Sequence, residues 1–468
     1  MKFIKLILLF IISQTGFGAI KLPALIGNSM ILQQQSKPAI WGWATAHTPI
    51  TIVTSWNKKT YTAVTNAKGE WKVNVATPVA GGPYTVTISG DNSKQVLTNI
   101  LIGEVWFCSG QSNMEMALKG NSSPILNSNE IILNADNPQL HLFTFKTAYS
   151  LTPLNEVKGE WAESTSETAR NFSAIAYQFG EMLQKKLHVP VGLIVSSVGG
   201  TMIESWMSKN SLANFPEVKV PEVFADTVKQ PWKQPTALFN GMIAPAINYG
   251  IKGMLWYQGE SNRQEPQLYA KLFPIMVADW RRQWHQGDFP FYYVQIAPFG
   301  SKDKTRSGPL IREAQLKAMD LIPNSGMAST MDVGMEKNIH YTNKTIPAHR
   351  LGYWALGKTY DIKGIGYHAP VLKSMDILRS KALLTFDNAP YLTSHEQPLT
   401  LFEVAGSDKV FYPAKATIKT NTVEVSSDKV PNPVAVRYAF KEFCVAELYN
   451  NDGIPASSFR TDDWDDVR

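Results

Sequence analysis

The sequence predicts an α/β protein: a parallel sheet covered by helices, with a small β-sandwich before it and a β-rich region after it. Strand-like runs separated by Gly, Pro and Asn turns fill residues 20–100 and predict the sandwich. From about 101 to 365 apolar strand-like runs alternate with helical ones, and strand-like runs return beyond 366. We therefore expect a β-sandwich accessory domain at 19–100, a central α/β/α domain at 101–365, and a β-rich region at 366–468.

The chain begins with the features of a secretory signal peptide in residues 1–18. Lys2 and Lys5 precede an apolar run from Leu6 to Ile12, and small residues follow around Gly18. The run is too short to span a bilayer, so we expect an exported protein, periplasmic or secreted, with no stable membrane insertion.

The charge of the chain indicates which partners it could bind, and its two cysteines allow at most one disulfide. The 45 basic and 39 acidic residues give a formal charge of +6 without a basic block, which argues against nucleic acid. Cys108 and Cys444 could form one disulfide in an oxidising compartment, but a free, packed thiol suits Cys108 on its expected strand equally well. The oligomeric state stays open.

Alternation of strands and helices defines the central domain. Expected strands cover 104–108, 191–198, 252–257, 291–296 and 326–331, and expected helices cover 172–187, 268–284 and 311–321. Strands separated by helices imply right-handed crossovers and a parallel, doubly wound sheet. Ligands bind such sheets outside the carboxyl ends of the strands.

Ser112 stands where the first of these strands ends. Residues 109–113 form a small polar turn between the strand and a helical segment. A serine on such a turn is held above the sheet, beside the first backbone N–H groups of the helix, which are unpaired and can receive an oxyanion. This is the geometry that a nucleophilic serine needs.

Polar residues and glycines also follow the other strands. The sets are Gly199, Gly200, Thr201, Glu204 and Trp206 after one strand, 258–262 after the next, and Asp332, Glu336, Asn338 and His340 after the last. Their convergence on one edge indicates a hydrolytic site. The proline-rich segment 207–240 is predicted to be a loop that forms part of the substrate wall.

These motifs, in this order, resemble the SGNH (GDSL-like) hydrolases and, within them, the sialate O-acetylesterase family. The resemblance covers nearly the whole mature chain, through 28–33, 103–116, 199–201, 241–245, the run Trp256-Tyr257-Gln258-Gly259-Glu260-Ser261-Asn262, Ile339-His340, 448–450 and 455–460. It implies a flavodoxin-like three-layer domain. It also implies a serine esterase that removes acetyl groups from carbohydrate, first of all from sialic acids.

The resemblance implies a role for each matched residue. Ser112 would attack the ester carbonyl, with His340 as general base and then general acid. The Ser112 N–H, the Gly200 N–H and the Asn262 side chain would form the oxyanion hole. The residues implied to contact the sugar are Gln111, Gln258 and Trp206. No metal or cofactor is expected, since the sequence holds neither a His-Glu-x-x-His motif nor a Cys/His cluster with ligand spacing.

The sequence differs from the usual family motif at the residue expected to pair with the histidine. Where the family usually has Asp-Ile-His, this chain has Asn338-Ile339-His340. Asn can fix a ring tautomer but cannot neutralise the imidazolium. Either Asn338 orients His340 without a charge, or a carboxylate does so: Glu260 first, because related carbohydrate esterases use a Glu in this segment, with Glu336 and Asp332 as alternatives. Glu260 could instead hold its loop by binding Arg281 or backbone donors.

Two other functions remain open from the sequence. The substrate could be acetylated xylan or another polysaccharide, because the serine site recognises the ester and the loops recognise the sugar. In a different class, the chain could be a non-catalytic carbohydrate-binding protein in which Asn338 marks the decay of the site.

Overall fold

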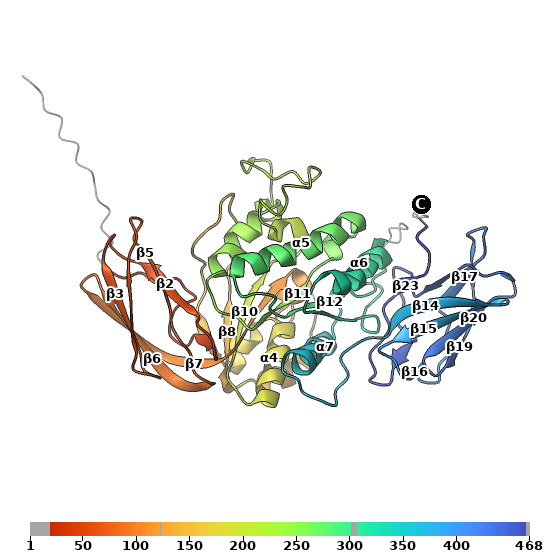
Figure 1. The fold of residues 1–468 in the computed structure, drawn as a ribbon, viewed down its shortest axis with the longest axis horizontal. Coiled ribbons are helices and arrows are strands. Elements are labelled where there is room, and N and C mark those ends of the chain that lie inside the picture. Colours follow the sequence, from red (N-terminus) through yellow and green to blue (C-terminus); the bar gives the residue numbers. More distant parts are fainter. Residues whose placement is uncertain (1–18, 122, 301–306, 465–468) are drawn as a thin grey trace, which may run out of the picture.

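The computed structural model describes residues 19–121, 123–300 and 307–464, so the predicted signal peptide lies outside the described residues. An N-terminal β module, a central α/β domain and a C-terminal β module follow one another along the long axis (Figure 1). Among the described helices, none has the length and apolar character needed to cross a membrane.

The N-terminal module shares a strand with the central domain. Its strands are β1 (Ile31–Gln33), β2 (Ala39–Trp43), β3 (Pro49–Thr54), β4 (Thr60–Val64), β5 (Glu70–Asn74), β6 (Gly81–Gly90) and β7 (Ser93–Gly110). The first half of β7 pairs with β6 and has exposed positions, whereas everything from Ile100 to Gly110 is buried. The expected domain boundary at residue 100 therefore falls inside one continuous strand of 18 residues.

The second half of β7 is the middle strand of the central sheet. The other strands are β8 (Asn137–Thr144), β9 (Trp161–Ser164), β10 (Val191–Ser197), β11 (Gly253–Tyr257), β12 (Phe291–Val294) and β13 (Ser325–Ala328), in the order β13-β12-β11-β7-β10-β8-β9. All pairs are parallel except β8 with β9, two strands that sequence patterning did not predict. The chain first builds the β8–β10 side and then the β11–β13 side, so the order reverses at β7, where such sheets bind ligands.

Helices cover both faces of this sheet, which confirms the predicted three layers. They are α1 (Ser112–Glu115), α2 (Ser128–Leu133), α3 (Ser166–Arg170), α4 (Ala174–Leu187), α5 (Pro266–Trp284), α6 (Ser307–Leu321) and α7 (Thr345–Trp354). α5 and α6 lie on one face, and α4 and α7 on the other (Figure 1). Alternate residues of β7 enter the two cores: Val105 and Phe107 pack on the α5 side, Trp106 and Cys108 on the α4 side.

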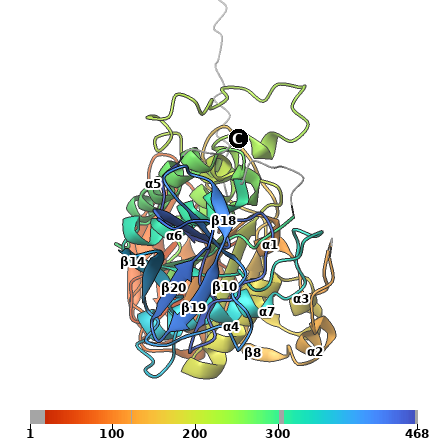
Figure 2. The ribbon, with the colours of Figure 1, turned by 90° about the vertical axis from the view of Figure 1, so that its right-hand side faces the viewer.

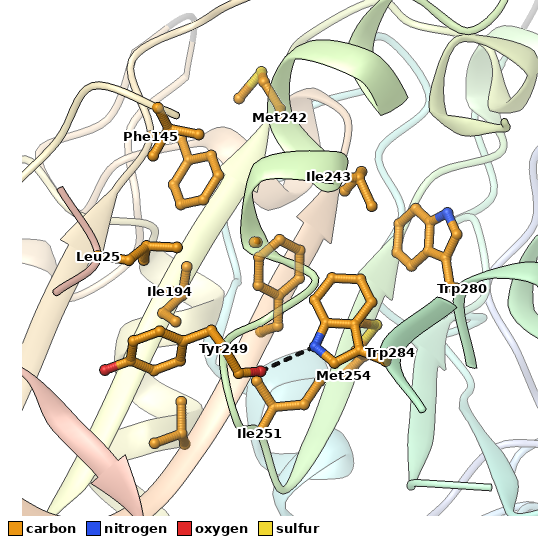
Figure 3. Close-up of a cluster of buried hydrophobic side chains, with 14 of the residues drawn as sticks. Leu25, Phe145, Ile194, Met242, Ile243, Tyr249, Ile251, Met254, Trp280 and Trp284 are labelled. Atoms are coloured by element: carbon orange, nitrogen blue, oxygen red, sulfur yellow. Dashed lines mark hydrogen bonds between the residues drawn. The ribbon is translucent and has the colours of Figure 1, made fainter. Parts of the chain in front are cut away.

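The core on the α5 side fastens the N-terminal module to the sheet (Figure 3). Leu25 of that module packs in the same cluster as Ile194 of β10, Met254 of β11 and Trp284 of α5. The indole N–H of Trp284 donates to the backbone oxygen of Tyr249 at 3.0 Å. This buried apolar contact stabilises the two parts as one unit.

The C-terminal module has antiparallel sheets and a core of its own. Its strands are β14 (Val371–Leu378), β15 (Lys381–Asp387), β16 (Leu392–Thr393), β17 (Phe402–Ala405), β18 (Phe411–Pro413), β19 (Lys415–Lys419), β20 (Thr422–Ser426), β21 (Ala435–Tyr438), β22 (Tyr449–Asn450) and β23 (Phe459–Arg460). Cys444 is buried here and Cys108 in the central sheet. Both are free thiols, so the disulfide considered from the sequence is not formed.

The predicted loop begins after η1 (Ile203–Trp206) and is irregular as far as η2 (Pro231–Lys233). Both views show it standing out beyond α5 (Figures 1 and 2). Its last two residues, Phe239 and Asn240, are helical, because they begin η3 (Phe239–Ile243), which is buried and is followed by η4 (Ala244–Ala246).

Candidate active site

The turn that carries Ser112 is held by both neighbouring strands. The N–H of Gln111 donates to the oxygen of Tyr257 at 2.9 Å, and the N–H of Val198 donates to the oxygen of Gly110 at 3.1 Å. Gly110 has φ +139°, and a Cβ there would lie 2.1 Å from the Tyr257 oxygen, so only glycine fits. The backbone therefore turns sharply at Gly110 and presents Ser112, half-buried, at the sheet edge.

Ser112 and His340 are in contact, although 228 positions separate them. The Oγ of Ser112 lies 2.8 Å from the Nε2 of His340, which stands on the loop between β13 and α7. Burial, and then the positive charge of Lys344, lower the pKa of His340. The imidazole is therefore neutral at neutral pH, as a base that accepts the serine proton must be.

Asn338 supports the backbone of His340. Its Oδ1 accepts a hydrogen bond from the His340 N–H at 2.9 Å, and its Nδ2 donates to the Oγ of Ser123 at 2.9 Å. Both ends of the carboxamide are engaged in holding the loop. The orientation of His340 by Asn338 thus acts through the main chain.

The three candidate carboxylates occupy different surroundings. Glu260 is buried, and its Oε1 accepts from the Nδ2 of Asn113 at 2.6 Å. Asp332 is engaged by Arg350 through both oxygens, each at 2.7 Å. Glu336 is exposed. The alternative partner considered for Glu260, Arg281, instead binds the backbone oxygen of Phe289.

The glycine pair after β10 meets the serine turn. The N–H of Gly199 donates to the Oε2 of Glu115 at 2.7 Å, so that donor is occupied. A Cβ at Gly199 would lie 3.3 Å from the Cβ of Ser112, which shows how closely the two segments approach. Gly200 has φ +67° and is exposed, and in the described residues its N–H is bonded to no protein acceptor.

Asn262 is fixed by several hydrogen bonds at the same edge. Its Oδ1 accepts from the N–H of Ile203 at 2.9 Å and from the Nε2 of Gln258 at 2.6 Å. Its Nδ2 donates to the Oε2 of Glu204 at 3.0 Å. These contacts fix the direction of the amide, and Asn262 itself has no exposed surface.

The three residues that the resemblance implies would contact the sugar are buried in this structure. Trp206 and Gln258 have no exposed surface, and Gln111 is 3% exposed. The Oε1 of Gln111 accepts from the N–H groups of Gly259 and Ser261 at 3.4 and 3.3 Å, and the indole of Trp206 donates to Thr201. These hydrogen bonds tie the side chains of Gln111 and Trp206 to the loops around the site.

Four residues of the site were not among the candidates from the sequence: Asn113, Glu115, Lys233 and Lys344. Asn113 is next to Ser112, Glu115 lies three positions after it, and Lys344 lies four positions after His340, so proximity in sequence was the only available signal for these three. Lys233 had no such signal. Among the described residues, no group of three or more His, Cys, Asp or Glu side chains is arranged to hold a metal ion.

Comparison with known proteins identifies the family of this chain. Residues 102–355 match the family described as "carbohydrate esterase, sialic acid-specific acetylesterase". The human sialate O-acetylesterase is 31% identical over 95% of this chain and 92% of its own length, and the mouse sialate O-acetylesterase is 30% identical over 97% of each. A crystal structure of a carbohydrate acetylesterase from Xanthomonas citri has 34% identity and a TM-score of 0.87, covering 95% of this chain and 100% of that one.

Proposed function

Because the chain belongs to the sialic acid-specific acetylesterase family of carbohydrate esterases, we propose that it deacetylates sialic acids, with Ser112 as nucleophile and His340 as general base. Family membership makes it a hydrolase of O-acetyl esters on carbohydrate. The 2.8 Å contact between Ser112 and His340 carries the proposed roles. That contact favours an esterase over a carbohydrate-binding protein whose site has decayed.

The proposed reaction runs through an acyl-enzyme. His340 Nε2 accepts the proton of the Ser112 hydroxyl while Oγ attacks the acetyl carbonyl, and it then gives that proton to the departing sugar oxygen. Water, deprotonated by the same imidazole, releases acetate and restores the serine. The three oxyanion donors are the N–H groups of Ser112 and Gly200 and the side-chain amide N–H of Asn262.

An acidic sugar is favoured by Lys233 at the rim of the site. A Cβ at Gly200 would lie 3.2 Å from the Nζ of Lys233, so this ammonium stands beside the proposed oxyanion donor. Lys233 is half-buried, and within the described part of the chain its Nζ has no hydrogen-bond or ion-pair partner. A carboxylate on the substrate would supply a charge-assisted partner there.

Turnover of O-acetyl sialic acid and of acetylated xylo-oligosaccharide by the purified mature protein tests the proposal. We expect the higher kcat/KM on the sialic acid. Equal or greater turnover of the xylo-oligosaccharide would replace sialic acid with a neutral polysaccharide as substrate, and inactivity on both and on p-nitrophenyl acetate would reject the catalytic roles.

We also propose that the protein is exported from the cytoplasm. The supporting feature is the amino-terminal sequence, with two lysines before a short apolar run. Sequencing of the protein from a cell fraction outside the cytoplasmic membrane should give an amino terminus near residue 19. A protein that keeps Met1 and stays with the cytoplasmic fraction contradicts export.

A further inference from the structure

We infer that Asn113, Glu260 and Lys344 are positioning residues: a buried clamp that holds the helix of Ser112 against the loop of His340. The inference deepens the proposed function, because it rests on the roles proposed there for Ser112 and His340. In this assignment Glu260 acts through Asn113.

One carboxamide joins the segments that carry the catalytic groups. Asn113 follows Ser112, and its Oδ1 accepts from the Nζ of Lys344 at 2.6 Å. Its Nδ2 donates to the Oε1 of Glu260 at 2.6 Å and to the backbone oxygen of Ile339, the residue before His340, at 3.3 Å. A shift of Asn113 would therefore move the serine turn and the histidine loop relative to each other.

All three side chains are buried. Lys344 has no exposed surface, Asn113 is 1% exposed and Glu260 is 9% exposed. The Nζ of Lys344 also lies 3.7 Å from the centre of the Tyr341 ring, a cation–π contact. Burying charges is unfavourable, and apolar replacements of buried ion pairs are often neutral or stabilising. A contribution to the stability of the fold therefore does not explain why a lysine and a glutamate are buried at these positions.

The charge of Lys344 also acts on the imidazole. Burial lowers the pKa of Lys344 to about 7, opposed by the charge of Glu260. Below that pH Lys344 is positively charged, and its charge lowers the pKa of His340. The other groups that act on this cluster are Arg263 on Glu260, and Tyr257, Asp332 and Arg350 on Tyr341. Without the Lys344 charge, the imidazole should protonate at a higher pH.

The test compares Lys344→Met and the double variant Lys344→Met/Glu260→Gln with the wild type. The rate on p-nitrophenyl acetate is measured against pH, and folding is checked by Tm. In Lys344→Met we expect the acid limb of kcat/KM to move to higher pH, and kcat at its optimum to fall tenfold to about a hundredfold with little change in KM. Lys344→Met alone leaves the buried carboxylate of Glu260 without the lysine charge, which can impair folding. The double variant removes both charges, so the test can still be made if the single variant folds poorly.

Lys358→Met is the matched control. Its Nζ donates to the oxygen of Ser325 at 2.9 Å, at the amino end of β13 and thus at the sheet edge opposite the site. This variant should keep the wild-type pH profile and kcat.

Two results would overturn the clamp. One is a folded double variant with the wild-type kcat and acid limb. The other is a fall in kcat without any displacement of the acid limb, because that result describes a merely structural role. Ser112→Ala, measured alongside, separates the proposals: activity that survives in Ser112→Ala rejects the proposed nucleophile, whatever the Lys344 variants do.

Discussion

Asp332 and Arg350 form a two-pronged ion pair, with both carboxylate oxygens 2.7 Å from guanidinium nitrogens. The guanidinium also donates to the backbone oxygen of Ser329 at 2.8 Å, so the pair ties α7 to the end of β13. Asp332 follows β13 as a catalytic carboxylate would. Its partner is nevertheless the arginine on α7.

Asp332→Asn should therefore lower stability more than catalysis. Both side chains of the pair are largely buried, at 8% and 15% exposure, so removing one charge should cost about 3 kcal/mol. Chemical denaturation measures this loss, and kcat of the folded protein should stay within a few-fold of wild type. Asp387→Asn, from an exposed pair with Lys373, is the control and should cost less than about 1 kcal/mol. A large fall in kcat at unchanged stability would return Asp332 to the catalytic set.

Ser112→Ala should abolish turnover of p-nitrophenyl acetate, with a loss in kcat of at least about 10⁴-fold, because it removes the hydroxyl that lies 2.8 Å from the Nε2 of His340. Ser211→Ala is the control. Its hydroxyl donates to a backbone oxygen in the long loop, and this variant should behave as wild type. A burst of nitrophenol in the wild type and none in Ser112→Ala would match an acyl-enzyme; equal rates in both would exclude Ser112 as nucleophile.

Asn338→Asp should raise the pH at which activity is lost in acid. A carboxylate at this position keeps the acceptor for the His340 N–H and adds a negative charge beside the imidazole. The pKa of His340 rises as a result, since the charge stabilises the imidazolium. More of the base is then protonated at mildly acidic pH, and the acid limb of kcat/KM moves upward. An unchanged limb would show that the position does not act on the ring.

Asn262→Ala should lower kcat by about 10²–10³-fold with a smaller effect on KM, as expected for an oxyanion donor. Glu204→Gln is the informative comparison. It keeps an oxygen to accept from the Nδ2 of Asn262, so its loss should be much smaller. Steady-state kinetics on p-nitrophenyl acetate distinguish the two. Equal losses in both variants would indicate that the loop, and not the donor, has been damaged.

Lys233→Met should weaken the use of an acidic sugar. We expect KM for O-acetyl sialic acid to rise about tenfold, because the hydrogen bond to a charged group is lost. Turnover of the neutral p-nitrophenyl acetate should not change. The wild-type preference should also decline at high salt, since the group is partly exposed and its charge is screened. A fall in kcat on both substrates would instead make Lys233 a part of the oxyanion site.

The sequence alone determined the layers and the two central residues of the site. Apolar runs alternating with helical ones predict β7, β10 to β13 and the helices α4 to α6, because burial on both faces demands such runs. The residues that follow each strand had to meet at one edge, and Ser112 and His340 do meet there. Strands β8 and β9 were not predicted, because their sequences contain more polar residues and lack the apolar runs of the other strands.

Only the tertiary structure decided what each polar side chain binds. The resemblance put Glu260 first as partner of the histidine, with Glu336 and Asp332 as alternatives. In the structure Glu260 binds Asn113, Glu336 is exposed and Asp332 binds an arginine on α7. The sequence also could not reveal that Trp206 and Gln258 are buried, or that Lys344 is buried next to the loop of His340. Hydrogen bonds of this kind join segments far apart in the chain, and their choice depends on side-chain directions and burial that no local pattern encodes.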